Sequence, residues 1–214
     1  MSIPATLCLI VIALLAGGGV GWVLCRRKAR REVEDLRRRL ARAFEEARTD
    51  PLTGVWNRKA FDEQLRIQTA VARRYGLPFS LIILDIDHFK RVNDDHGHAA
   101  GDAVLQHLAG LLRSSVREAD LIVRQGGDEF ALLLPQTGLD GAVQVAERIR
   151  RQVASAPFPG SSGSVQITLS GGVVSLIREE PTNQLLHRAD AALYQAKRGS
   201  GESDPGRNRI FRDG

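Results

Sequence analysis

The chain has 214 residues, which is enough for one domain of ordinary size and a short additional segment. Its net charge of +5 resides in residues 26–48, which hold ten Lys/Arg and five Asp/Glu, so the rest of the chain is formally neutral. This distribution argues against a nucleic-acid partner. The two cysteines, Cys8 and Cys25, are too few for a disulfide framework or a zinc site.

An uncharged apolar stretch occupies residues 3–25 and is long enough to cross a bilayer as a helix. A cleaved signal peptide is the main alternative, but signal peptides carry their positive charges before the apolar stretch, whereas the basic run 26–31 follows it. The pattern predicts a single-pass anchor in the inner (cytoplasmic) membrane, with everything after Cys25 in the cytoplasm. An unmodified Cys25 at the interface is preferred over a lipidated one.

Residues 26–49 contain a helical seam of apolar side chains between charged ones. The seam consists of Val33, Leu36, Leu40, Ala43 and Ala47, at spacings of three and four. About two to three heptads is short for an independent coiled coil, but two chains held in one membrane could pair through it. We therefore expect a dimerisation helix, and a solvated spacer helix is the alternative.

Helical and strand patterns alternate through the remaining residues, 50–214. The expected helices are 58–74, 100–115, 139–154 and 182–198, and the expected strands are 79–86, 120–124, 129–135, 164–174 and 208–212. Their βαββαβ order predicts an α/β sandwich of the α+β type, with a mainly antiparallel sheet and helices packed on it.

The expected strand 79–86 brings two carboxylates together at its end, Asp85 and Asp87. Residues two apart in a strand share a face, so both side chains should point the same way. Such like charges repel unless a cation or a basic group lies between them. Asp85 is therefore a predicted metal ligand, while metal ligation and capping of the next turn both stay open for Asp87.

A second acidic cluster, Gly126-Gly127-Asp128-Glu129, lies between two apolar strands. Two glycines followed by Asp indicate a hairpin turn in any protein. A hairpin alone does not require adjacent carboxylates, however. Paired glycines let a backbone approach a phosphate closely, and Asp128 and Glu129 suit a hard cation such as Mg²⁺.

Further motifs accompany these clusters in a fixed order. They are Asp50-Pro-Leu-Thr-Gly54, Asn57-Arg58, Leu84-Asp-Ile-Asp-His-Phe-Lys90, Asn93-Asp94, Gly97-His98, Gly101-Asp102, Ser170-Gly-Gly-Val173 and Ala189-Asp-Ala-Ala-Leu-Tyr-Gln-Ala-Lys197. From about Asp50 to Arg212 the chain resembles the GGDEF-domain diguanylate cyclases, which condense two GTP molecules into cyclic di-GMP. The resemblance implies a fold similar to nucleotidyl-cyclase and polymerase palm domains, and a homodimer with one GTP on each half.

The resemblance also implies two Mg²⁺ ions in each active site, with Mn²⁺ as the alternative. The matching ligands are Asp85, the backbone carbonyl of Ile86, and Asp128. Glu129 matches a residue near the reacting hydroxyl, as a metal ligand or as the general base. Such ions activate the attacking 3′-hydroxyl and offset charge on the leaving pyrophosphate.

For the nucleotide, Asn93 and Asp102 match the family's guanine contacts. Taken without the family, Asn93 lies in a turn and Asp102 could cap a helix that begins near Ala103. The matching phosphate contacts are Lys90, Lys197 and Arg207, with Gly126 and Gly127 near the substrate. A solvated lysine is the alternative for each lysine. Family members usually continue almost directly from the match to Lys197 into Gly-Arg-Asn-Arg, so residues 198–205 are an insertion here, and they could displace Arg207.

Residues Arg117-Glu-Ala-Asp120 stand five residues before Gly126, the offset of the family's product-inhibition site. Arg148 matches a second guanine-binding arginine, although Arg150 and Arg151 are close alternatives. Cyclic di-GMP is therefore expected as product and as inhibitor. The alternative for Arg117 and Asp120 is a surface ion pair of little energetic value.

The sequence as a whole predicts a membrane-anchored diguanylate cyclase. The first alternative is a catalytically silent domain that binds cyclic di-GMP or GTP as a receptor, which the intact Asp85, Asp128, Glu129 and Lys197 argue against. The second is a cyclase that makes a mononucleotide product, which the pair of Asn93 and Asp102 argues against.

Overall fold

The computed structural model describes residues 33–34, 36, 48–161, 163–198 and 206–213. The chain divides into two units, residues 1–47 and 48–214, and in the first only three exposed helical residues are described. The expected anchor at residues 3–25 lies outside the described residues, as does most of the expected helix 26–49. Within the described part of the chain, no helix combines the length and the apolar character needed to cross a bilayer.

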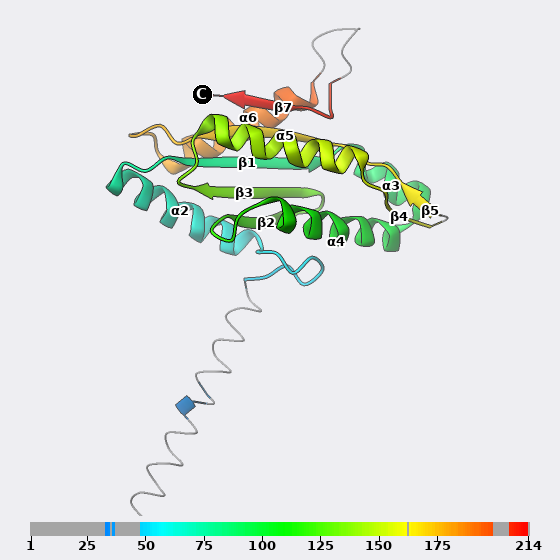
Figure 1. Ribbon diagram of the computed structural model, residues 1–214. Helices are drawn as coiled ribbons and strands as arrows, with labels where there is room; N and C mark the ends of the chain where they lie inside the picture. The colour runs from blue at the N-terminus through cyan, green and yellow to red at the C-terminus, as the bar shows by residue number, and fades with distance from the viewer. Residues whose placement is uncertain (1–32, 35, 37–47, 162, 199–205, 214) are drawn as a thin grey trace, which may run out of the picture. The chain divides into compact units, whose positions relative to one another are not determined.

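The second unit is built on a five-stranded sheet in the order β2-β3-β1-β6-β7 (Figure 1). The strands are β1 (Phe79–Ile86), β2 (Leu121–Gly126), β3 (Glu129–Pro135), β6 (Leu169–Ser175) and β7 (Ile210–Asp213). The central β1 is antiparallel to β3 and β6, and β7 is parallel to β6. The predicted α/β class with a mainly antiparallel sheet is confirmed.

Helices cover both faces of this sheet. They are α2 (Arg58–Tyr75), α3 (Phe89–His96), α4 (His98–Ser115), α5 (Leu139–Ser155) and α6 (Thr182–Lys197). Every residue of β1 is buried, because Ile82 and Leu84 pack towards α4 and α5 while Leu81 and Ile83 pack towards α2 and α6. Since side chains alternate along a strand, Asp85 faces the same side as α6.

The close approach of α6 to β6 depends on glycine. A Cβ atom at Gly172 would collide with the backbone of α6 at Ala189 and Leu193. Without side-chain bulk at this position, α6 lies directly against the sheet. Its last residue, Lys197, therefore reaches the end of β1.

Two local predictions were wrong. Helix α3 was not predicted, and Asn93 lies in this helix rather than in a turn. The expected strand 164–174 is two strands, because β5 (Gly163–Val165) pairs with β4 (Phe158–Gly160) in a separate hairpin and only β6 joins the main sheet.

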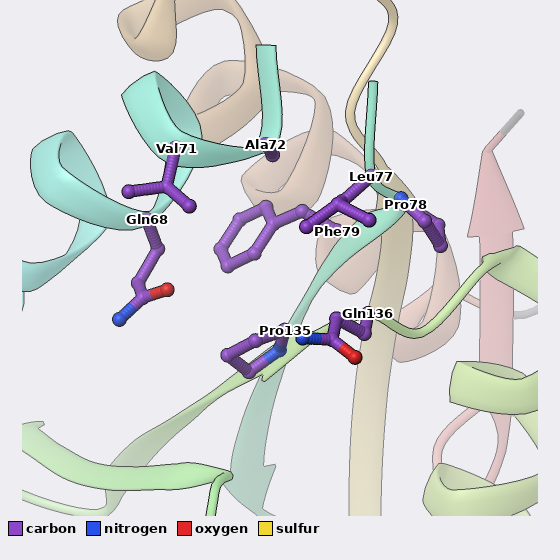
Figure 2. Close-up of a pocket in the computed structure, with 8 residues that line it drawn as sticks. All are labelled: Gln68, Val71, Ala72, Leu77, Pro78, Phe79, Pro135 and Gln136. Carbon is purple, nitrogen blue, oxygen red and sulfur yellow. The ribbon is translucent and has the colours of Figure 1, made fainter. Parts of the chain in front are cut away.

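A small cavity lies at the end of β1 that is remote from Asp85 (Figure 2). It has a volume of about 60 Å³, and Ala72 and Phe79 are among its apolar lining residues. The eight lining side chains shown in Figure 2 carry no charge. Neither its size nor its chemistry suits a nucleotide.

Candidate active site

Three elements bring charged side chains to the end of β1. Asp85 lies opposite Glu129 of β3 in the strand register. The backbone N–H of Ile86 donates to the carbonyl oxygen of Asp128 at 3.4 Å, which fixes the turn before β3 against the end of β1. Lys197 Nζ, at the end of α6, donates to Asp85 Oδ2 at 2.7 Å. The structure therefore brings together four of the predicted site side chains.

The electrostatics of this cluster are unfavourable for an ionised Asp85. Burial is the main cause that raises the pKa of Asp85, to about 6. The bond from Lys197 lowers this pKa, while the negative charges of Asp128 and Glu129 raise it further. One lysine thus leaves the cluster with excess negative charge, which a bound cation would offset.

The donor set of the cluster fits Mg²⁺, since Asp85, Asp128, Glu129 and the carbonyl of Ile86 all offer oxygen. Among the described residues, no group of three or more acidic, histidine or cysteine side chains is arranged so that it could hold a metal ion by itself. Mg²⁺ is usually held by one or two carboxylates together with substrate phosphates, so such a group is not required.

The turn between β2 and β3 is held from the start of the domain. Gly127 has φ of 53°, a left-handed conformation that favours glycine. Its carbonyl oxygen accepts from Arg124 Nε at 3.0 Å and Nη2 at 2.8 Å. Arg124 Nη1 also donates to Asp50 Oδ1 at 3.1 Å.

Asp50 is itself firmly held. Although burial acts in the opposite direction, hydrogen bonds from Thr53 and Arg124 keep the pKa of Asp50 below its usual value. Asp50 belongs to a motif at the domain start, whereas Arg124 was not singled out from the sequence, and no local pattern pairs the two residues. Their contact links the domain start to the Gly-Gly turn.

Asp87 does not cap the helix that follows it. Helix α3 has no side-chain cap among the described residues, and the residue at its N-cap is His88. The buried Asp87 carboxylate instead accepts hydrogen bonds from Thr168, Ser170 and the backbone N–H of Asn208. Capping of the next turn, one of the two predictions for this residue, was wrong.

The two candidate guanine contacts lie on consecutive helices. Asn93 is on α3, and Asp102 is an exposed residue inside α4, which begins at His98, so the prediction that Asp102 caps a helix was wrong. A Cβ atom at Gly101 would collide with Asn93 Oδ1. Gly101 therefore makes room for the Asn93 carboxamide between the two helices.

The candidate phosphate contacts lie in different settings. Lys90 is exposed on α3, whereas Lys197 is bonded to Asp85. The backbone N–H of Arg207 donates to Ala196 O at 3.0 Å, at the end of α6. Despite the inserted residues before it, Arg207 therefore lies at this end of the sheet.

A separate cavity of about 170 Å³ is lined by Arg117, Asp120 and Arg148. Asp120 Oδ2 accepts from the backbone N–H of Arg117 at 2.9 Å, and Arg148 Nη2 donates to Ser115 O at 2.6 Å. Of the neighbouring arginines, Arg150 contacts Glu147 and Asn208 instead. The three residues predicted for product inhibition thus share one cavity.

Comparison with known proteins identifies the relatives of this arrangement. A family model described as "Diguanylate cyclase, GGDEF domain" matches residues 47–203. The chain is 47% identical over 154 residues to diguanylate cyclase DgcP of Pseudomonas aeruginosa, a match that covers 72% of the chain and 23% of DgcP. It is 42% identical over 171 residues to the response regulator PleD of Caulobacter vibrioides, covering 78% of the chain and 38% of PleD.

Solved structures give the same result. The coiled coil and GGDEF domain of DgcB from Caulobacter crescentus, in complex with c-di-GMP, matches with a TM-score of 0.78 and 34% identity, covering 95% of the chain and 99% of that structure. Diguanylate cyclase SiaD of Pseudomonas aeruginosa, in complex with its activator SiaC, has a TM-score of 0.74 and 35% identity, covering 98% and 78%. The chain spans well under half of DgcP and of PleD.

Proposed function

We propose that this chain, which belongs to the GGDEF diguanylate cyclase family, condenses two GTP molecules into cyclic di-GMP and two pyrophosphates. The observation that carries the proposal is the cluster at the end of β1. There, buried Asp85 faces Glu129, lies near Asp128, and has Lys197 as its basic partner. An excess of oxygen donors and negative charge at one point suits metal-assisted phosphoryl chemistry.

Different residues contact the guanine base, the phosphates and the reacting oxygen. Asn93 and Asp102 offer an amide and a carboxylate to the edge of guanine. Lys197 and Arg207 hold the β- and γ-phosphates together with the exposed Lys90. Lys197 is bonded to Asp85 in the protein alone, and its ammonium can turn to a phosphate oxygen, because lysine is a flexible point charge.

Two divalent ions held by Asp85, Asp128 and the Ile86 carbonyl would activate the 3′-hydroxyl and offset charge on the leaving group. Glu129 stands beside this position as a further ligand or as the base that accepts the proton. Gly126 and Gly127 carry no side chains, so the backbone of the turn can approach a phosphate.

The reaction requires two copies of the chain, since each 3′-hydroxyl attacks the α-phosphate of the other GTP. The seam in residues 26–49 and an anchor at residues 3–25 would supply this pairing by raising the effective concentration of the second copy. Val33 is 51% exposed and Leu36 is 70% exposed in a single chain, which favours an apolar partner.

Product inhibition is part of the proposal. Arg117 and Arg148 can offer planar donor pairs to guanine O6 and N7, and Asp120 can accept from N1 and N2. The cavity that they share is separate from the cluster at Asp85.

The test is product analysis after incubation with α-labelled GTP and Mg²⁺. We expect labelled cyclic di-GMP and unlabelled pyrophosphate from the wild type. Asp128→Asn should form almost no product, because loss of this carboxylate weakens metal binding at the point where negative charge develops in the reaction. A chain that leaves GTP intact but binds labelled cyclic di-GMP would instead be a receptor. A mononucleotide cyclic product would show that the second alternative is correct.

A further inference from the structure

Asp87 joins segments that are far apart in the sequence. Its side chain is 1% exposed, and its Oδ2 accepts hydrogen bonds from Thr168 Oγ1 at 2.7 Å and from the Asn208 backbone N–H at 2.8 Å. Its Oδ1 accepts from Ser170 Oγ at 2.7 Å and lies 3.7 Å from Arg207 Nη1. One carboxylate therefore holds the start of β6 and the segment that leads into β7.

The segment before β7 is strained. Arg207 has φ of 68° and Asn208 has φ of 46°, both left-handed. Asparagine adopts this conformation more readily than other non-glycine residues, but for Arg207 it is unfavourable and persists only where the surrounding structure fixes it. The hydrogen bond from Asn208 to Asp87 is one of these fixing contacts, and the bond from Arg207 to Ala196 is another.

The position of Arg207 depends on such contacts more than that of Lys197 does. Lys197 is carried by α6, whereas Arg207 follows the inserted residues 198–205. At 3.7 Å, the ion pair of Arg207 with Asp87 is longer than a hydrogen bond, and the Arg207 side chain is 36% exposed. Asp87 thus steers the guanidinium while leaving its N–H groups accessible to a phosphate.

We propose that Asp87 is a positioning residue that acts through Arg207, by holding the strained 206–209 segment so that the guanidinium faces the triphosphate. The proposal rests on the proposed function, in which Arg207 contacts the β- and γ-phosphates. It assigns the second aspartate of the β1 end a task distinct from that of Asp85.

Asp87→Asn tests this role because it removes contacts to the 206–209 segment and keeps those to β6. The hydroxyls of Thr168 and Ser170 can reverse and accept a hydrogen bond from a carboxamide NH₂ group. The Asn208 N–H and the Arg207 guanidinium can only donate. The NH₂ group of Asn at position 87 would replace one of the two carboxylate oxygens, and at either place it would face one of these donors. Thr168→Val is the matched control, because it removes a donor to the same carboxylate without touching that segment.

The kinetic arm is a double-mutant cycle with Arg207→Ala. Alone, Asp87→Asn should raise the half-saturating GTP concentration about ten-fold with a smaller change in kcat, whereas Thr168→Val should change it less than about two-fold. In the Arg207→Ala background, Asp87→Asn should add less than about two-fold. An equal effect of Asp87→Asn in both backgrounds would show that Asp87 does not act through Arg207.

The second arm is limited trypsin cleavage, which needs no activity. Cleavage after Arg207 and Arg209, located by mass spectrometry, should be at least about five-fold faster in Asp87→Asn than in the wild type or in Thr168→Val. Unchanged cleavage would overturn the proposed hold on this segment. If the wild type made no cyclic di-GMP, the proposed function would be wrong. The cleavage experiment would still show whether Asp87 holds the 206–209 segment.

Discussion

At the scale of single residues, two aspartates that are two positions apart have opposite energetic roles. The carboxylate of Asp87 accepts hydrogen bonds from three donors, whereas Asp85 is paired with Lys197 alone among the described residues. Burial and neighbouring negative charge outweigh this single ion pair and raise the pKa of Asp85 to about 6. A raised carboxyl pKa means that the folded state binds a proton more tightly than the unfolded state does, so ionised Asp85 destabilises the fold.

We therefore predict that Asp85→Asn abolishes turnover but raises Tm in the presence of a chelator. The wild type loses stability as pH rises from 3.8 to about 6, and the loss is complete above that range. At pH 7.5 the variant should melt about 4 °C or more above the wild type, and the gap should narrow at pH 5. Calorimetry at both pH values measures this gap.

Asp140→Asn is the control for that experiment, because Asp140 is 86% exposed in its ion pair with Arg212. Its Tm should match the wild type at both pH values. A lower Tm for Asp85→Asn at pH 7.5 would mean that the bond to Lys197 outweighs the burial of the carboxylate.

Gly101 shows how a residue without a side chain can set specificity. A Cβ atom there would collide with Asn93 Oδ1, the proposed guanine contact. Gly101→Ala should therefore raise the half-saturating GTP concentration about ten-fold, since a hydrogen bond that discriminates bases is worth roughly 1–3 kcal/mol. Steady-state kinetics with GTP measures the effect.

Gly110→Ala is the matched control in the same helix, because a Cβ atom at Gly110 meets nothing within 4 Å. Alanine is favoured over glycine in a helix by about 1 kcal/mol, so this variant should be more stable and equally active. Equal kinetics for the two variants would rule out the displacement of Asn93.

At the scale of elements, the β2–β3 hairpin is positioned by a contact from outside its own strands. Arg124 joins the Gly127 carbonyl to Asp50 at the start of the domain. The register of the hairpin shifts between Arg124 and Gly126, so the strand pairing alone does not fix the turn. Arg124 and Asp50 therefore supply rigidity that the hairpin lacks.

We predict that Arg124→Ala lowers kcat about ten-fold or more while the Tm changes by only a few degrees. The reason is that misplacing Asp128 and Glu129 by about 1 Å costs catalysis far more than folding. Arg212→Ala is the control, since Arg212 is 60% exposed and remote from the turn. Initial rates at saturating GTP measure the difference, and wild-type rates in Arg124→Ala would refute the positional role.

The elements also show which local patterns suffice for prediction. Strand β1 was predicted with its observed bounds, because a short continuous apolar run between polar turns is typical of a buried strand. Helix α3 was missed because its Asn, Asp and His residues are poor helix formers, and buried Phe89 and Val92 stabilise it through tertiary contacts. The division of strand 164–174 depends on which sheet each half joins, and a local pattern does not contain that information.

At the scale of the whole molecule, the candidate site is made from residues that no local pattern joins. Motif order predicted the residue types at the site, but Lys197 reaches Asp85 only because α6 packs on β6 at Gly172. The hydrogen bond from Asn208 to Asp87 spans a still longer sequence separation. Neither contact has a signature in a window of the sequence, so both required the three-dimensional structure.

The last prediction concerns coupling between two sites. Arg117, Asp120 and Arg148 share a cavity that is separate from the cluster at Asp85. If cyclic di-GMP bound there holds the catalytic domains of two chains in a nonproductive arrangement, product inhibition is a coupling free energy between distinct sites. Because an arginine pairs with O6 and N7 of guanine through two parallel hydrogen bonds, removing one arginine should weaken this binding strongly.

Arg117→Ala should therefore leave the initial rate nearly unchanged and raise the inhibition constant for cyclic di-GMP at least about ten-fold, the loss expected for charge-assisted hydrogen bonds. Progress curves that bend in the wild type should then stay linear for longer in the variant. Arg151→Ala is the control, because Arg151 lies on the same helix as Arg148 and its Nε donates to Glu147 O at 3.2 Å. Curves that bend equally in Arg117→Ala and the wild type would reduce Arg117 and Asp120 to surface residues without a role in inhibition.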